Sequence, residues 1–127
     1  MKNLDDIRSR ALGTRTGTVA AALAEMVRLR KFDISADDIQ SLDQRNDQII
    51  SGWVFAYRLV QLPKSDWDSI LRNAISDTNP RIREQVCDII GDEHIERLRD
   101  DLKRLFDDPV SFVAEAAKYN YSEMFDA

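Results

Sequence analysis

Aspartates at helical spacing are the side chains of this sequence whose pattern suggests binding chemistry. In a helix predicted over residues 35–51, Asp43 and Asp47 are four residues apart, and Asp37 and Asp38 precede them. Like charges at this spacing share a helix face and destabilise an isolated helix by about 0.2–0.5 kcal/mol. An acidic surface kept at that cost can attract a basic partner. We therefore expect these four aspartates to bind a basic protein, the alternative being a solvated helix face.

Trp67 and its neighbour Asp68 are the second candidate contact with a partner. Tryptophan is enriched among the interface residues whose truncation costs the most binding energy. Trp53 and Trp67 both begin predicted helices, so packing in the core is the alternative role for each. The binding role requires Trp67 to be partly exposed.

The sequence contains no constellation of residues suited to catalysis, so we expect a non-enzymatic protein without cofactor or metal. His94 lies among acidic residues, where we expect a surface side chain in the first turn of a helix. Cys87 lies next to a core position and is expected to serve as a small packing residue. The step of seven residues from Cys87 to His94 matches no zinc-binding spacing. The paired aspartates lack the alternating ligands and central glycine of a calcium-binding EF-hand loop.

Length and composition indicate one soluble domain over residues 1–127. Hydrophobic residues make up 43% of the chain and charged residues 32%, which is enough apolar surface for a core. The net charge of −5 argues against nucleic acid and acidic membranes as partners. Residues 19–29 are too short and too charged to span a bilayer, and residues 1–10 do not resemble a secretory signal. With a single cysteine, a reducing cytoplasmic location is the default expectation.

Helices must position the candidate residues, because apolar residues recur at helical spacing along the chain and strand patterns are nearly absent. Ser35 is expected to cap the helix that carries the aspartates, Gly52 to mark a bend or a helix boundary, and Pro80 to begin a later helix. The predicted helices cover residues 4–12, 18–31, 35–51, 53–62, 65–76, 80–91 and 92–106, followed by a last helix with Val113, Ala117 and Tyr121 on its inner face.

Charged residues on the helix predicted over residues 92–106 can satisfy one another. Glu93 with Arg97 and Asp100 with Arg104 are opposite charges four residues apart. Side chains at this spacing pair on one helix face. We therefore expect that face to be solvated and to need no partner.

Two similar turns, Asp77-Thr-Asn-Pro80 and Asp107-Asp108-Pro109, indicate an internal repeat. They lie about thirty residues apart, a period typical of repeat architectures in which neighbouring helix pairs bury each other's apolar faces. The apolar positions that follow the two turns keep the same separation, Ile82 with Val113 and Val86 with Ala117.

The first copy resembles a HEAT repeat. Ile82-Arg83 stands at the family's Val-Arg position, and Ile90-Gly91 stands at its Leu-Gly position. The second copy departs from the pattern, because Ser111 and Phe112 are inserted and Ala114 replaces the usual arginine.

The resemblance covers about residues 50–121 and implies an all-α fold of stacked antiparallel helix pairs, a short HEAT-like α-solenoid or bundle. Residues 51–121 would form the helix pairs, and residues 1–50 would form N-terminal capping helices. A generic helix bundle with similar turns is the alternative.

The leading hypothesis is a protein-binding module whose acidic surface contacts a basic protein. One version is an inhibitor of the immunity or antitoxin type that occludes a toxin nuclease, because such nucleases are basic where they bind phosphate. Two alternatives stay open. One is contact with a nucleic-acid backbone through the basic N-terminal section and the pair Arg81 and Arg83. The other is a structural subunit that docks through Tyr121, Met124 and Phe125.

Overall fold

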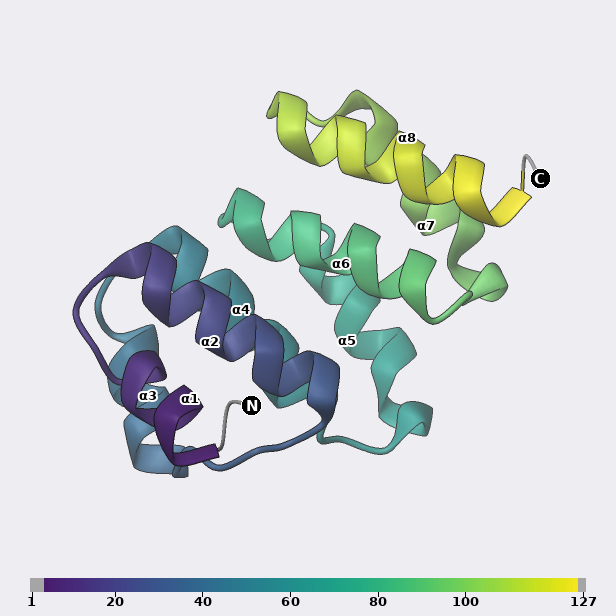
Figure 1. Ribbon diagram of the computed structural model, residues 1–127. Helices are drawn as coiled ribbons and strands as arrows, with labels where there is room; N and C mark the ends of the chain where they lie inside the picture. The colour runs from purple at the N-terminus through teal and green to yellow at the C-terminus, as the bar shows by residue number, and fades with distance from the viewer. Residues whose placement is uncertain (1–3, 126–127) are drawn as a thin grey trace. The chain divides into compact units, whose positions relative to one another are not determined.

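The computed structural model describes residues 4–125, with side chains from Asp6 to Phe125. Every regular element in that range is a helix, so the predicted all-α class is confirmed (Figure 1). The elements are α1 (Leu4–Ala11), α2 (Thr16–Leu29), α3 (Ala36–Asp43), α4 (Gln48–Leu59), the 3₁₀ helix η1 (Lys64–Asp66), α5 (Trp67–Ala74), α6 (Pro80–Asp92), the 3₁₀ helix η2 (Glu96–Leu98), α7 (Arg99–Arg104), the 3₁₀ helix η3 (Leu105–Asp107) and α8 (Ser111–Phe125).

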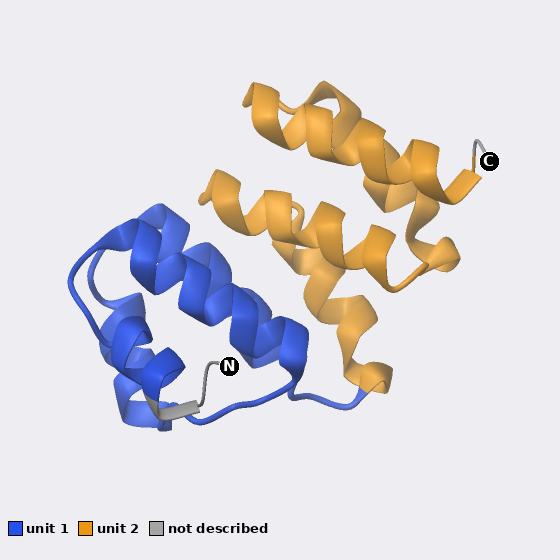
Figure 2. Cartoon of the chain, in the orientation of Figure 1, with its two compact units in different colours: residues 1–63 blue, residues 64–127 orange. Residues whose placement is uncertain are grey.

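The chain divides into two compact units, residues 1–63 and residues 64–127, called unit 1 and unit 2 below (Figure 2). Unit 1 contains α1 to α4, and unit 2 contains the elements from η1 to α8. A single domain over residues 1–127 stays a prediction.

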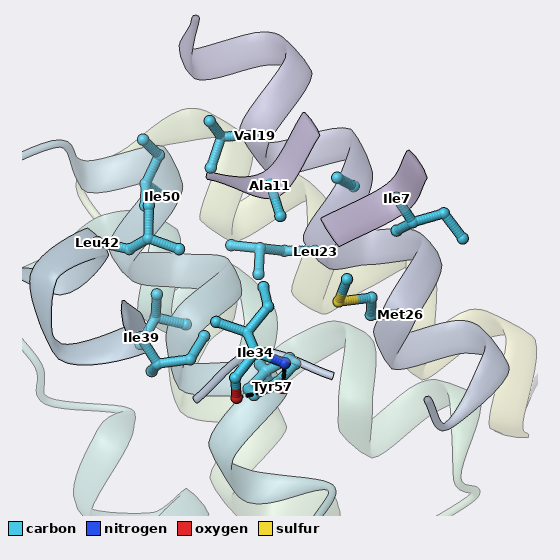
Figure 3. Packing of buried hydrophobic residues seen from close by; sticks show 12 residues of the cluster. Ile7, Ala11, Val19, Leu23, Met26, Ile34, Ile39, Leu42, Ile50 and Tyr57 are labelled. Carbon is cyan, nitrogen blue, oxygen red and sulfur yellow. Dashed lines mark hydrogen bonds between the residues drawn. The ribbon is translucent and has the colours of Figure 1, made fainter. Parts of the chain in front are cut away.

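Unit 1 is held together by a cluster of buried apolar side chains (Figure 3). α2 and α4 pack side by side and run in the same direction. Thr16 at the start of α2 hydrogen-bonds Asp47 before α4, and Phe32 after α2 packs on Tyr57 near the end of α4. Each fully buried aliphatic side chain contributes about 1.5–3 kcal/mol. The cluster consists of Ile7, Ala11, Val19, Ala22, Leu23, Met26, Ile34, Ile39, Leu42, Ile50, Val54 and Tyr57.

The continuous helix predicted over residues 35–51 is wrong. The chain forms α3 and α4 instead, with a turn over residues 44–47 between them. Asn46 has a φ of 58°, in the left-handed region that a continuing α-helix cannot use. Asp47 then caps α4, since its Oδ1 accepts hydrogen bonds from the N–H groups of Ile49 and Ile50 at 3.0 and 3.1 Å. An aspartate that satisfies two such donors favours the start of a new helix.

Local signals placed most other helix starts correctly. Ser35 caps α3 as predicted, and its hydroxyl accepts a hydrogen bond from the N–H of Asp38 at 3.1 Å. Pro80 is the first residue of α6, also as predicted. The bend or helix boundary expected at Gly52 is wrong, because Gly52 is buried inside α4, which runs without a break from Gln48 to Leu59.

In unit 2, α6 packs against α8 and α5, and α7 packs against α8. This places the two helices that follow the acidic proline turns, α6 and α8, in direct contact. The buried apolar residues of the unit are Trp67, Leu71, Ala74, Val86, Cys87, Ile89, Ile90, Ile95, Leu98, Leu102, Leu105, Val113 and Ala117.

The continuous helix predicted over residues 92–106 is also wrong. α6 extends to Asp92, and His94 then adopts a φ of 51° that ends it. The N–H groups of His94 and Ile95 donate to the carbonyl oxygens of Gly91 and Ile90 at 3.2 and 3.0 Å, which closes the helix end. The rest of the segment is divided among η2, α7 and η3.

The charged residues of the segment 92–106 do not form the expected pairs Glu93–Arg97 and Asp100–Arg104. Three of the pairs connect separate elements instead of successive turns of one helix, which ties the elements of unit 2 to one another. Among the described residues, the ion pairs of this segment are Lys64–Glu93, Asp68–Arg97, Arg72–Asp101 and Asp101–Arg104.

Candidate functional site

A hollow in the surface of unit 1 lies between α3 and α4, and we call it the α3–α4 groove. Its volume is about 280 Å³. The floor is apolar and buried, whereas the polar side chains at its edge are exposed. The groove can therefore take an apolar side chain of a partner while polar groups contact the surrounding segment. Its lining residues are Ile34, Ala36, Ile39, Gln40, Tyr57, Arg58 and Gln61.

Tyr57 makes the floor of the groove rigid. Its hydroxyl donates to the carbonyl oxygen of Ile34 and accepts from the N–H of the same residue, both at 3.2 Å (Figure 3). Its ring meets that of Phe32 edge to face, with 5.3 Å between the centroids. Burial raises the pKa of Tyr57, and the nearby charge of Asp33 acts in the same direction. Tyr57 is thus a neutral structural phenol that joins the loop before α3 to α4.

Arg58 contributes the positive charge at the edge of the groove, and groups of α3 contact its guanidinium. Its two terminal nitrogens donate to Asp43 Oδ2 at 3.2 Å and to Gln40 Oε1 at 3.1 Å. Gln61 donates to the carbonyl oxygen of Tyr57 at 2.9 Å. The side-chain amides of Gln40 and Gln61 each have a further hydrogen-bonding group beyond these contacts, which can serve the main chain of a bound segment.

The structure places the three predicted aspartates of α3 at different distances from the groove. Asp43 follows Ile39 and Gln40 by one turn, so it lies on the groove side, where it contacts Arg58. Asp37 is exposed at the edge of that face, three residues before Gln40. Asp38 is half-buried and shares a face with the core residue Leu42. Asp37 and Asp43 therefore border the groove, and Asp38 does not.

Asp47 has a structural role that the sequence did not indicate. Besides capping α4, its Oδ2 accepts a hydrogen bond from the hydroxyl of Thr16 in α2. That hydrogen bond lowers the pKa of Asp47, with smaller contributions in the same direction from the cap and from Arg45. The acidic face shared by Asp43 and Asp47 does not exist, because the two residues belong to different elements.

Trp67 and Asp68 lie in unit 2 and contact neighbouring elements of that unit. Trp67 is only 3% exposed. It therefore packs in the core, as the alternative proposed, and is not an exposed anchor for a partner. Asp68 accepts two hydrogen bonds from the guanidinium of Arg97, one of them at 2.8 Å. The same contact lowers the pKa of Asp68. Both residues thus stabilise unit 2.

Cys87 and His94 are the two residues for which the sequence predicted a packing role and a surface position. Cys87 is fully buried, and burial raises the pKa of its thiol to about 12, so the nucleophilic thiolate does not form near neutral pH. His94 is exposed as expected, but its expected place in the first turn of a helix is wrong, because it lies in the turn after α6 with a φ of 51°. Among the residues that the structure describes, no three His, Cys, Asp or Glu side chains are grouped to hold a metal ion. Within residues 4–125, no helix is long and apolar enough to cross a membrane.

The two arginines considered for nucleic-acid contact are engaged within unit 2. Arg83 is 12% exposed and donates to Asp108 and to the carbonyl oxygen of Asp77. Arg81 lies over the ring of Phe112, with 3.9 Å between its guanidinium carbon and the ring centroid, and it pairs with Glu84. The Arg83 guanidinium is therefore occupied and nearly buried, whereas Arg81 keeps part of its surface exposed.

The groove residues Ile34, Tyr57 and Gln61 were not among the sequence candidates. The segment around Tyr57 did show apolar residues on more than one helix face, which indicated a well-covered helix. Residues 34 and 57 are related by no helical spacing, so only the packed structure brings them together.

Comparison of the chain with known proteins finds no matching family model, no matching curated protein and no matching solved structure.

Proposed function

We propose that this chain is a non-enzymatic protein-binding module and that its α3–α4 groove binds a segment of a basic protein. The segment would place an apolar side chain in the groove and lysine or arginine side chains beside it. The observation that carries the proposal is a hollow whose floor contains Ile34, Ile39 and Tyr57, together with nearby carboxylates. These are the carboxylates of Asp33, Asp37 and Asp43.

Two physical contributions favour a basic protein segment in the groove. Burying one aliphatic side chain in the groove is worth about 1.5–3 kcal/mol. The carboxylates and the chain's net charge of −5 favour the approach of a positively charged partner and raise its association rate. Arg58 does not reverse this preference, since Asp43 already contacts it.

An inhibitor of the immunity or antitoxin type is the concrete version that we propose. Toxin nucleases present basic surfaces because they bind phosphates, and a small acidic protein can cover such a surface. The chain is small and acidic, and its groove and the carboxylates beside it would supply the contact.

We also propose that residues 51–121 form HEAT-like stacked helix pairs, with residues 1–50 as capping helices. Support comes from the packing of α6 on α8 and from Arg83, which contacts both acidic proline turns. An experimentally determined structure tests this: successive helix pairs should superimpose by one regular rotation and translation. Pairs related by unrelated transformations would contradict the repeat.

Charge reversal at the groove tests the binding proposal. Asp33 and Asp37 are exposed, so Asp33→Lys with Asp37→Lys should leave the fold intact. Candidate partners are basic proteins encoded beside this chain's gene, and affinity is measured by titration calorimetry with each purified candidate. We expect the double variant to bind at least about tenfold more weakly, which corresponds to about 1.4 kcal/mol.

The matched control is Glu115→Lys with Glu123→Lys, which changes the net charge equally at exposed positions of α8. It should bind with an affinity close to that of the unchanged chain. An uncharged variant, Ala36→Trp, fills the groove and should also weaken binding. If the α8 control loses as much affinity as the groove variant, net charge and not the groove governs binding. If no basic protein encoded nearby binds the unchanged chain, the proposed function fails.

A further inference from the structure

A cluster of cations and aromatic rings lies on the surface where α7 packs against α8 in unit 2. The guanidinium carbon of Arg99 lies 4.5 Å from the ring centroid of Phe125 and 5.9 Å from that of Tyr121. The ammonium of Lys103 lies 5.3 Å from the Tyr121 ring centroid. The Tyr121 ring also meets that of Phe106 edge to face at 5.3 Å. We call these residues the α7–α8 cluster.

The cations of this cluster differ from the other arginines of unit 2. Among the described residues, neither Arg99 nor Lys103 forms an ion pair with a carboxylate, although the chain has 23 acidic residues and 18 basic ones. The aromatic rings hold both cations in place instead, which suits an anion that comes from outside the chain. The arginines that do contact carboxylates are Arg72, Arg81, Arg83, Arg97 and Arg104.

The donors of Arg99 and Lys103 lie beside the hydroxyl of Tyr121. Arg99 Nε donates to that hydroxyl at 3.4 Å, which leaves the two terminal nitrogens of the guanidinium for another acceptor. The hydroxyl accepts from Arg99, so its own proton can be donated outward. Lys103 follows Arg99 by one helical turn, and its ammonium adds a second positive charge on the same face.

The electrostatics of the hydroxyl agree with this geometry. The hydrogen bond from Arg99 lowers the pKa of Tyr121, and Lys103 acts in the same direction. Negative charge is therefore favoured at this point of the surface. The hydrogen bond with Tyr121 raises the pKa of Arg99, and the charges of Asp100 and Glu96 act in the same direction. These two carboxylates reduce the positive potential and keep the expected affinity modest.

We propose that the α7–α8 cluster is a binding site for a dianionic oxyanion of the phosphate type, with Arg99, Lys103 and the Tyr121 hydroxyl as donors. Two cations match the two charges of a phosphate monoester, whereas a carboxylate would leave one cation without a counter-charge. Packing on Phe125 and Tyr121 orients the Arg99 guanidinium before the anion arrives, which lowers the entropy cost of binding. This site is independent of the α3–α4 groove.

Titration of the full chain with inorganic phosphate at low ionic strength tests the site by NMR. We expect saturable shifts of the Arg99 Nε–H and of the Tyr121 ring signals. Lys103→Met removes a charge and keeps an apolar stem at an exposed position, so it should weaken binding about tenfold without unfolding unit 2. Tyr121→Phe should weaken binding less, because it removes one neutral donor.

Arg104→Met is the matched control, since Arg104 lies on the same helix but contacts Asp101. It should bind phosphate as the unchanged chain does. Absence of saturation with phosphate, equal weakening by the control, or equally tight binding of acetate would each overturn the proposal. Phenyl phosphate and adenosine monophosphate separate the sources of the anion. If phenyl phosphate binds more tightly than inorganic phosphate, the anion is a phosphate carried on an aromatic ester. If adenosine monophosphate binds more tightly than inorganic phosphate, the anion belongs to a nucleotide.

Discussion

Arg83 and Asp108 form a bidentate ion pair that joins the first turn of α6 to the segment before α8. Arg83 Nε and Nη2 donate to the two carboxylate oxygens of Asp108 at 2.7 and 3.0 Å. The side chains are 12% and 4% exposed. Arg83 Nη1 also donates to the carbonyl oxygen of Asp77 at 2.7 Å, and Asp108 accepts from the N–H of Val110 at 2.9 Å. The pair therefore connects the two acidic proline turns.

Removing one partner of this pair should destabilise the protein strongly. Asp108→Asn leaves the Arg83 guanidinium without its counter-charge in a nearly buried position, which costs about 3 kcal/mol. Urea denaturation measures the loss. Arg83→Met should cost a similar amount, and the double variant should lose less than the sum of the two. Asp107→Asn at the exposed neighbouring position is the control, with an expected change within about 0.5 kcal/mol. Strictly additive losses for Arg83 and Asp108 would show that the two side chains do not act together.

Gly91 should be required for the contact between α6 and α8. A Cβ atom at Gly91 would lie 2.0 Å from Asn120 Oδ1 and 2.8 Å from Asn120 Cβ. Asn120 is held there by its own hydrogen bonds to Asp88 and to the carbonyl oxygen of Ala116. We expect Gly91→Ala to lower the free energy of unfolding by about 1–3 kcal/mol.

Gly17→Ala is the control for this substitution, because Gly17 is also helical and a Cβ there would have no neighbour within 4 Å. It should stabilise the protein by at most about 0.5–1 kcal/mol, which is the cost of a mid-helix glycine relative to alanine, because Gly17 lies in the first turn of α2. Adding Asn120→Ala to Gly91→Ala should recover part of the loss. The double variant should be more stable than the summed losses of Gly91→Ala and Asn120→Ala predict. If it is not, the cause is not a steric clash.

Protonation of Asp88 should make the protein more stable in mild acid than at neutral pH. Burial raises the pKa of Asp88 to about 6, and the hydrogen bond from Asn120 offsets this only in part. Glu84 and Asp92 on the same helix raise it further. The unfolded chain ionises this group near pH 4, so between pH 4 and pH 6 the folded state binds the additional proton. Stability should therefore increase as the pH falls through this window, by about 2–3 kcal/mol in total.

Asp88→Asn isolates this contribution. The substitution should raise the free energy of unfolding at pH 7.5 and flatten its pH dependence between pH 4 and pH 6. Asp108 has the opposite sign, because Arg83 lowers its pKa and its stabilisation disappears only in stronger acid. If the Asp88→Asn variant keeps the pH dependence of the unchanged chain between pH 4 and pH 6, Asp88 is not its source.

Asp47 should contribute to stability in both of its contacts. Asp47→Ala removes the cap of α4 and the acceptor for Thr16, so the expected loss is about 1–2 kcal/mol, measured by thermal unfolding. Thr16→Val should cause a smaller loss, because it removes only the hydrogen bond to Asp47. The losses of the two substitutions should not add fully in the double variant. Asp37→Ala, at an exposed position of α3, is the control and should change the stability little. Equal effects of Asp37→Ala and Asp47→Ala would contradict the structural role of Asp47.

Local sequence signals determined the helical class and several of its boundaries. Ser35 caps α3 and Pro80 begins α6 because capping and proline chemistry act within a few residues of the chain. The acidic turn before Pro80 was predicted for the same reason. Burial of Cys87 followed from its place beside apolar positions at helical spacing.

The tertiary structure decided which charged and aromatic side chains meet. Asp43 and Asp47 lie four residues apart in the sequence, but a turn at Asn46 separates them. Arg58 becomes the partner of Asp43, and Thr16 becomes the partner of Asp47. The burial of Trp67 and the groove formed by Ile34 and Tyr57 depend in the same way on how whole helices pack. Helical spacing relates residues three or four positions apart, whereas these contacts join residues far apart in the chain, and only the packing of the helices selects them.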